Sequence, residues 1–144
     1  TEITDYLADL KAQQFDTLND NDLLITSDTI VWLEEEALGK PKDAAEAFKM
    51  LRKLSGKKHQ VLTSISIKNP KFQTIINDTT AVYFKELTDD EINYYIKTCQ
   101  PFDKAGAYGI QEWIGFIGID RLDGSYFNVM GLPVHKLYKE LMKL

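Results

Sequence analysis

A single carboxylate, Asp28, stands inside the apolar and β-branched run LLITSDTIVWL, from Leu23 to Leu33. Burying an unpaired carboxylate costs several kcal/mol, so proteins keep such a group as a hydrogen-bond hub or because it does chemistry. The position alone leaves both interpretations open. In the second case, Asp28 would be placed to accept a proton from an attacking water.

Three other features, together with Asp28, could form a site that binds and hydrolyses a nucleotide. Lys40 lies between Gly39 and Pro41, on a loop from which its ammonium group can reach a ligand. The stretch DKAGAYGIQ, residues 103–111, is rich in small residues that let backbone and polar groups approach a ligand closely. It ends in Gln111, which offers a donor and an acceptor on one amide. The simpler alternatives are a solvated loop lysine and a tight turn between a helix and a strand.

Hydrophobic periodicity predicts the elements that must position these groups. Thr88 and Glu91 have the spacing of a capping box, and Asp43 is placed to cap a helix that runs to Leu54. We expect helices over residues 3–15, 43–54, 88–96 and 133–141, and strands over residues 23–33, 60–68, 74–85, 114–119 and 126–129. The second and third strands should form a hairpin around Asn69-Pro70. This pattern favours one α/β or α+β domain over residues 1–144.

Composition narrows the class of partner. The 144 residues are 44% hydrophobic, enough to bury a core, and 22 acidic against 17 basic side chains give a net charge of -5. That balance argues against a nucleic-acid surface, which is normally basic. No apolar run approaches the length of a membrane span, and the single cysteine, Cys99, fits a reducing compartment. We therefore expect a cytoplasmic protein whose partner is a small molecule.

Five separated segments resemble the Maf family of nucleoside triphosphate pyrophosphatases, and they occur in the family's order. They are SDTIVWL (27–33), LGKPKD (38–43), MLRKLSGKKHQVLTS (50–64), PFDKAGAYGIQ (101–111) and GSYFNVMGLPV (124–134). The resemblance implies an α/β fold with a mixed, bent β-sheet and flanking helices, in two lobes around a cleft as in inosine triphosphatase. It also implies cleavage of a nucleoside triphosphate between its α- and β-phosphates with a divalent metal, usually Mg²⁺.

The resemblance assigns roles to five residues of this sequence. Asp28 corresponds to the proton acceptor, Lys11 and Lys40 to substrate-binding lysines, and Thr29 and Gln111 to positions linked to substrate choice. The Asp-Thr pair with the AYGIQ ending is similar to the branch that acts on dTTP and UTP rather than 7-methyl-GTP. A glutamine amide can pair with the O4 and N3–H edge of uracil or thymine, whereas cytosine presents the reverse pattern. Homodimers occur in the family, so a homodimer is a further expectation.

The sequence also departs from the family pattern. The opening motif Ser-x-Ser-Pro-Arg-Arg is not found after Thr1, and the two arginines are Arg52 and Arg121. The family's Ala-Arg-Glu-Lys-Ala corresponds to ADLKA, residues 8–12, which keeps Lys11. We therefore expect the family's N-terminal strand and phosphate-binding loop to be missing. Tested alone, this chain should hydrolyse UTP or dTTP poorly, and the missing segment should restore activity.

Two other classes of protein remain open from the sequence. One is a nucleotide-binding or division-associated interaction protein without catalysis, and the other is a structural domain in which Asp28 is a hydrogen-bond hub. Asp28→Asn tests the first, and a thermal-shift scan of nucleotides with magnesium tests the second. His59 and His135 have no recognised metal-binding spacing, so no zinc site is expected and the metal ligands stay unassigned.

Overall fold

One five-stranded sheet, with the strand order β2-β1-β3-β4-β5, organises the computed structural model, which describes residues 1–15 and 17–144. The strands are β1 (Leu24–Leu33), β2 (Glu36–Leu38), β3 (Lys58–Asn69), β4 (Phe72–Phe84) and β5 (Ile119–Asp123). The helices are α1 (Glu2–Gln13), α2 (Ala44–Leu54), α3 (Asp89–Cys99), α4 (Trp113–Gly118), α5 (Tyr126–Met130) and α6 (Val134–Leu141), with a 3-10 turn η1 (Ala105–Ala107). The predicted α/β fold is confirmed. A mixed sheet was expected, and the described strand pairs are all antiparallel.

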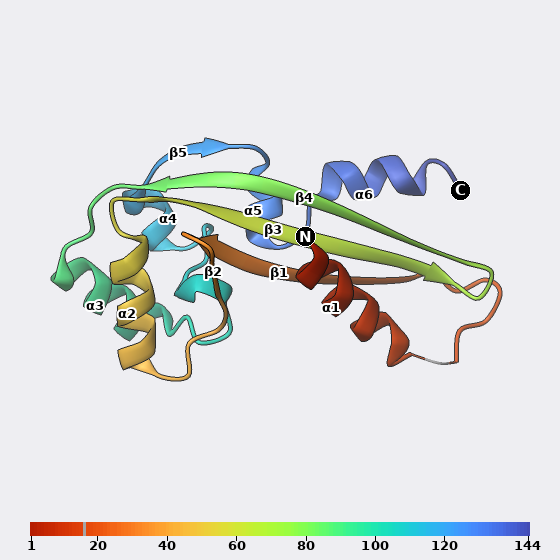
Figure 1. The fold of residues 1–144 in the computed structure, drawn as a ribbon, viewed down its shortest axis with the longest axis horizontal. Coiled ribbons are helices and arrows are strands. Elements are labelled where there is room, and N and C mark those ends of the chain that lie inside the picture. The colour runs from red at the N-terminus through yellow and green to blue at the C-terminus, as the bar shows by residue number, and fades with distance from the viewer. Residues whose placement is uncertain (16) are drawn as a thin grey trace.

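The hairpin of β3 and β4 runs the length of the molecule and carries the other elements (Figure 1). Its register extends from the pair Lys58↔Tyr83 to the pair Asn69↔Phe72, so the predicted turn is confirmed. Because successive side chains of a strand point to opposite faces, Val61 and Ser64 of β3 lie on different faces of the sheet. Val61 joins the apolar core, whereas the Ser64 hydroxyl donates to Thr4 of α1.

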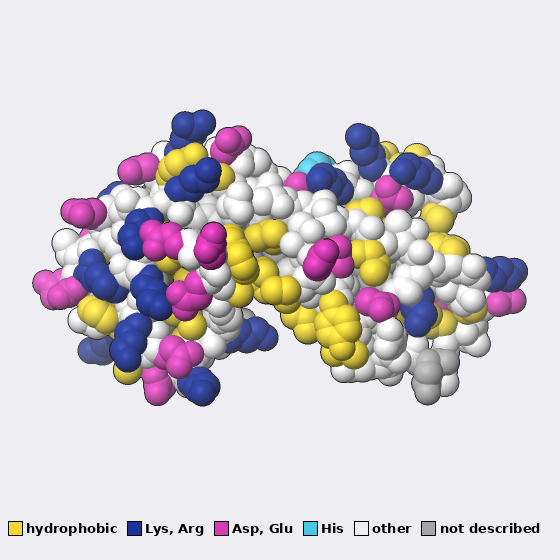
Figure 2. Space-filling model, in the orientation of Figure 1, with side chains coloured by type: hydrophobic (Ala, Val, Ile, Leu, Met, Phe, Trp, Pro, Cys, Tyr) yellow, Lys and Arg dark blue, Asp and Glu magenta, His cyan; other side chains and the backbone are white. Residues whose placement is uncertain are grey.

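The helices gather in two groups that give the molecule two lobes. In Figure 1, α2, α3 and α4 lie at one end of the hairpin and α1 lies toward the other end, with α6 across the sheet from α1. Figure 2, in the same orientation, shows a notch in the surface between the end that carries α2, α3 and α4 and the part that carries α1. The apolar core belongs to the first group, where β1 and β3 pack against fully buried side chains that include Leu51, Leu54, Ile92 and Tyr95. No helix in the described ranges is long and apolar enough to cross a membrane.

Two predicted strands were wrong, because residues 114–119 and 126–129 lie mainly in the short helices α4 and α5. The apolar residues of α4 suggested a strand, but tertiary packing overrides β propensity. A Cβ on Gly115 would lie 1.8 Å from the Ile110 carbonyl oxygen, so the helix backbone itself packs there. In α5, Ser125 caps the helix and the fully buried Asn128 bonds to the sheet. The capping box at Thr88 and the Asp43 cap are confirmed.

Candidate active site

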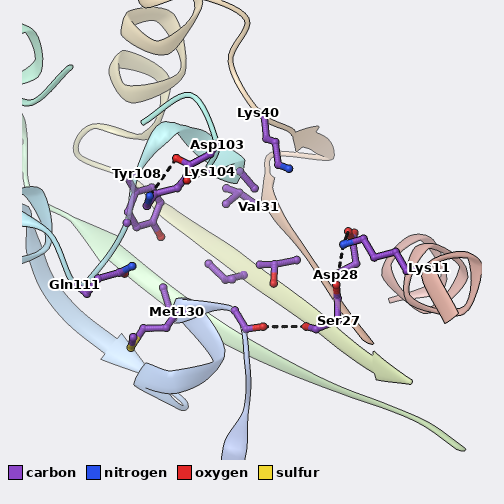
Figure 3. Close-up of a pocket in the computed structure, with 16 residues that line it drawn as sticks. Lys11, Ser27, Asp28, Val31, Lys40, Asp103, Lys104, Tyr108, Gln111 and Met130 are labelled. Atoms are coloured by element: carbon purple, nitrogen blue, oxygen red, sulfur yellow. Dashed lines mark hydrogen bonds and ion pairs between the residues drawn. The ribbon is translucent and has the colours of Figure 1, made fainter. Parts of the chain in front are cut away.

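A pocket with a cavity volume of about 260 Å³ lies beside β1 and brings together all five predicted site residues (Figure 3). Lys11 comes from α1, Asp28 and Thr29 from β1, Lys40 from the loop after β2, and Gln111 from the loop between α3 and α4. These residues lie far apart in the sequence. Their convergence on one cavity is what a shared ligand site requires.

Lys11 and Asp28 lie close together because α1 packs closely against the sheet. Ala8 and Ala12 of α1 are fully buried, and the Ala8 carbonyl accepts a hydrogen bond of 2.8 Å from the Thr26 hydroxyl. Lys11 Nζ then lies 2.8 Å from Asp28 Oδ1 and 2.8 Å from the Ser27 carbonyl oxygen. The Asp28 side chain is 17% exposed and that of Lys11 is 50% exposed. The carboxylate is therefore paired at one oxygen and reachable from the pocket.

The edge of β1 beside the pocket is free over most of its length. β2 pairs only with Val31–Leu33, while β3 pairs with β1 from Leu24 to Trp32. Among the described strands, the Leu24–Ile30 segment therefore has β3 as its single neighbour. Asp28 and Thr29 sit on this open edge, where a ligand can approach from the side.

Thr29 follows Asp28 but points to the opposite face of the sheet. Its Oγ1 lies 2.9 Å from Thr63 Oγ1, and the Thr63 hydroxyl donates to the Asn128 carbonyl oxygen at 3.1 Å. The Ser27 hydroxyl likewise donates to the Gly131 carbonyl oxygen at 2.9 Å. These contacts fasten the end of α5, and the segment from Val129 to Gly131 lines the pocket. Thr29 can thus influence the pocket's shape as well as contact a ligand.

Lys40 is positioned by the glycine-rich loop. Gly106 N–H donates to the Gly39 carbonyl oxygen at 3.0 Å, which joins the two loops. Figure 3 shows the Lys40 side chain directed into the space between Asp28 and the glycine-rich loop. Its ammonium group can therefore meet a negatively charged group bound next to Asp28.

The two glycines of DKAGAYGIQ serve contacts within the protein. Gly106 has φ +70°, and a Cβ there would lie 2.8 Å from Val31 Cγ2. A Cβ on Gly109 would lie 2.7 Å from Glu112 Oε1. Ala105 does line the pocket, but Ala107 is fully buried in the core. The expectation that the small residues of this stretch let groups approach a ligand closely was therefore wrong for Ala107.

Lys104 and Met130 line the pocket without having been predicted as site residues. Lys104 Nζ lies 3.1 Å from Asp103 Oδ1, and this hydrogen bond is the main cause that lowers the pKa of the Asp103 carboxyl. The Asp-Lys pair in DKAGAYGIQ was a usable signal for Lys104. Met130 had no such signal, because it directly follows residues 126–129, which were predicted to be a strand.

His59 occupies a structural position behind the pocket wall. It is 2% exposed, its Nε2 lies 2.6 Å from the Tyr108 hydroxyl, and its ring meets those of Phe84 and Tyr108 edge to face. Burial lowers the pKa of His59 to about 4. His135 is exposed and lies 3.8 Å from Asp78. The two histidines therefore lie in different environments, His59 in the core and His135 at the surface.

The charges around the pocket suit a polyanion accompanied by a divalent cation. Lys11, Lys40 and Lys104 line it together with the carboxylates of Asp28 and Asp103. Within residues 1–15 and 17–144, no group of three or more His, Cys, Asp or Glu side chains could hold a metal ion alone. Mg²⁺ commonly binds through one or two carboxylates plus substrate phosphates. Asp28 and Asp103 are the two carboxylates that the pocket offers to such a shared site.

Comparison with known proteins gives a family match over the whole chain and relatives that share one name. A profile of the Maf family, described as "Maf-like protein", matches residues 1–144. A protein named dTTP/UTP pyrophosphatase from Christiangramia forsetii is 56% identical over 144 residues, covering 99% of this chain and 74% of that protein. Proteins of the same name from Flavobacterium psychrophilum and Phocaeicola vulgatus are 58% and 53% identical. They match 98% and 99% of this chain and 73% and 75% of their own lengths.

Proposed function

This chain belongs to the Maf family, and from that premise we propose that it hydrolyses dTTP and UTP to the nucleoside monophosphate and pyrophosphate. The relatives that support this substrate class carry the name dTTP/UTP pyrophosphatase at 53–58% identity. The observation that carries the proposal is one pocket that joins two carboxylates, three lysines and an amide. Those groups are the parts that hydrolysis of a nucleoside triphosphate needs.

Asp28 is the proposed general base. It accepts a proton from the water that attacks the α-phosphorus, and the bond from that phosphorus to the bridging oxygen breaks to release pyrophosphate. Lys11 holds one carboxylate oxygen at 2.8 Å, which fixes the side chain and leaves the other oxygen for the water. The same lysine offsets the repulsion between this carboxylate and the triphosphate.

Lys11 and Lys40 are the proposed phosphate-binding residues. Negative charge spreads over the phosphate oxygens in the transition state, and positioning with charge neutralisation supplies most of the catalysis of phosphoryl transfer. Lys40 faces Asp28 across the pocket from a separate loop (Figure 3). The two ammonium groups can therefore hold the triphosphate from two sides. A divalent cation held by the substrate phosphates would add positive charge at the same place, while the second Asp28 oxygen is kept for the water.

Gln111 is the proposed base-reading residue at the far end of the pocket from Lys11. Figure 3 shows its amide pointing inward, opposite the side of β1 that carries Asp28. Ala105, Val129 and Met130 supply apolar surface for a pyrimidine ring. The amide matches the O4 and N3–H pair of uracil or thymine. Thr29 contributes to substrate choice by helping to hold the segment from Val129 to Gly131, through its contact with Thr63. Free nucleoside triphosphates are cytoplasmic, and we place the reaction there.

A substrate panel tests the proposal. With Mg²⁺ present, pyrophosphate release should be fastest with UTP and dTTP, and slower with CTP, ATP and GTP. The same nucleotides, bound in the presence of Ca²⁺, should raise the melting temperature in that order, because ligands that bind the folded state stabilise it. Release of orthophosphate in place of pyrophosphate would contradict the reaction. Equal shifts with every nucleotide would contradict the role of Gln111, and no shift with any would contradict the nucleotide site.

A further inference from the structure

Tyr95 of α3 makes an unusual set of contacts behind the pocket. It is fully buried and is not one of the residues that line the pocket. Its hydroxyl accepts a hydrogen bond from Gly109 N–H at 3.0 Å and donates one to Glu112 Oε1 at 2.7 Å. Glu112 N–H donates in turn to the Gly109 carbonyl oxygen at 3.0 Å. One hydroxyl thus ties together both ends of the turn that carries Gln111.

We infer that Tyr95 is a positioning residue that fixes the Gly109–Glu112 turn and so sets the choice of base, an inference that rests on the proposed role of Gln111. The physical reason is the distance over which the glutamine amide must meet the base. Its oxygen and nitrogen have to reach the O4 and N3–H edge at hydrogen-bond distance, and a shift of the backbone that carries Gln111 would move both atoms off that edge. Selectivity therefore requires a turn that does not move.

The packing around Gly109 leaves the turn little freedom. A Cβ there would lie 2.7 Å from both Glu112 Oε1 and Lys104 Cε. Lys104 Nζ lies 3.9 Å from Glu112 Oε1, so the carboxylate has a cation on one side and the Tyr95 hydroxyl on another. Glu112 is therefore the second positioning residue. It links a buried hydroxyl to a lysine on the pocket wall.

The Tyr95 hydroxyl keeps its proton at every pH of an enzyme assay. Burial, followed by the hydrogen bond to Glu112, raises the pKa of Tyr95 well above its usual value. The hydroxyl therefore donates to Glu112 and accepts from Gly109 throughout. Since Asp28 and Lys11 lie on β1 and α1, loss of this hydroxyl should disturb recognition of the base more than the chemical step.

Tyr95→Phe tests the inference, with Tyr94→Phe as its matched control. Tyr94 is the preceding residue of α3, is 54% exposed and packs edge to face on Trp113. We expect Tyr95→Phe to reduce the preference for UTP over CTP, measured as the ratio of kcat/KM values, by about tenfold. The change should appear mainly as a higher KM for UTP with kcat nearly kept. Tyr94→Phe should leave the ratio unchanged.

Hydrogen exchange of the free protein separates the positioning role from the nucleotide chemistry. Amides of residues 105–113 should exchange about tenfold faster in Tyr95→Phe than in the wild type, while those of α1 stay the same. Glu112→Ala replaces a side chain that is 24% exposed rather than a core residue, and should give the same two effects because Tyr95 loses its acceptor. Glu112→Gln keeps an acceptor for Tyr95 and should restore most of the selectivity.

The outcomes that overturn the inference are distinct from those that overturn the function. Unchanged UTP preference in folded Tyr95→Phe or Glu112→Ala protein refutes the positioning role, whether or not exchange becomes faster. Equal losses with UTP and CTP would mean that the hydroxyl serves stability alone. A wild-type protein without any preference among pyrimidines would instead refute the role of Gln111 on which the inference rests.

Discussion

The wall of the pocket that carries Gln111 rests on an apolar core, whereas the wall that carries Lys11 rests on small and hydroxyl-bearing side chains. Leu51, Ile92 and Tyr95 are fully buried beneath the first wall. The buried residues of α1 are Thr4, Ala8 and Ala12. The first wall is fixed by large side chains that fill space, and the second by hydrogen bonds and close backbone contact.

This difference matches the role that we propose for each wall. Reading a base requires a donor and an acceptor held in a fixed orientation, and close packing supplies that. Holding phosphates requires charges that can exchange partners. The Lys11–Asp28 pair, with one side chain half exposed, is of a kind worth about 0–1 kcal/mol, so an incoming polyanion can rearrange it at small cost.

The largest expected effect on turnover comes from the wall that carries Lys11 and Asp28. Asp28→Asn should lower turnover of UTP by about 100- to 10,000-fold, because the amide no longer accepts a proton. Binding of UTP should persist, since the substitution removes a negative charge near the triphosphate. Pyrophosphate release and calorimetric titration measure the two quantities. A variant that keeps wild-type turnover would show that Asp28 is a structural hub.

A pair of stability variants sharpens the contrast between the walls. Leu51→Ala should lower the free energy of unfolding by about 2–5 kcal/mol, because it leaves a cavity in the core. Thr26→Val removes the hydroxyl that donates to the Ala8 carbonyl and should cost about 1 kcal/mol. Urea unfolding of both variants measures these changes. Similar losses in the two would argue against two kinds of packing.

The free energy of unfolding should depend on pH partly through His59, which is buried behind the wall that carries Gln111. The pKa of buried His59 is about 4, below its ordinary value of 6.5, so the unfolded chain binds the proton more tightly. The stability that neutral His59 contributes is therefore complete above pH 6.5 and is lost as the pH falls toward 4. The loss should amount to roughly 3 kcal/mol. Urea unfolding between pH 7 and pH 4 measures it.

His59→Gln should flatten this pH dependence, and His135→Gln should not, because His135 lies at the surface with a side chain 53% exposed. An equal effect of both substitutions would place the titration elsewhere in the molecule.

The long elements could be predicted from the sequence for identifiable reasons, and the five candidate site residues line one pocket, although their roles stay predictions. The hairpin has regular alternation around Asn69-Pro70, and the helix after Thr88 has a capping box. Asp28 is conspicuous as a lone acid in an apolar strand. The two short helices were missed because α4 and α5 consist of β-prone residues that tertiary contacts hold in helices. The function of the glycines was misjudged because their neighbours, Val31 and Glu112, are partners only in three dimensions.

The strand β1 also sets the reach of the site. Val31 lies next to the glycine-rich loop and Asp28 pairs with Lys11, so three residue steps along one strand, about 10 Å, separate the two contacts. A deletion or insertion of one residue would turn every following side chain to the other face of the sheet. The distance between Asp28 and Val31 along β1 therefore cannot change by one residue without disrupting the sheet. A pocket for a longer or shorter nucleotide would have to arise from changes in the surrounding loops.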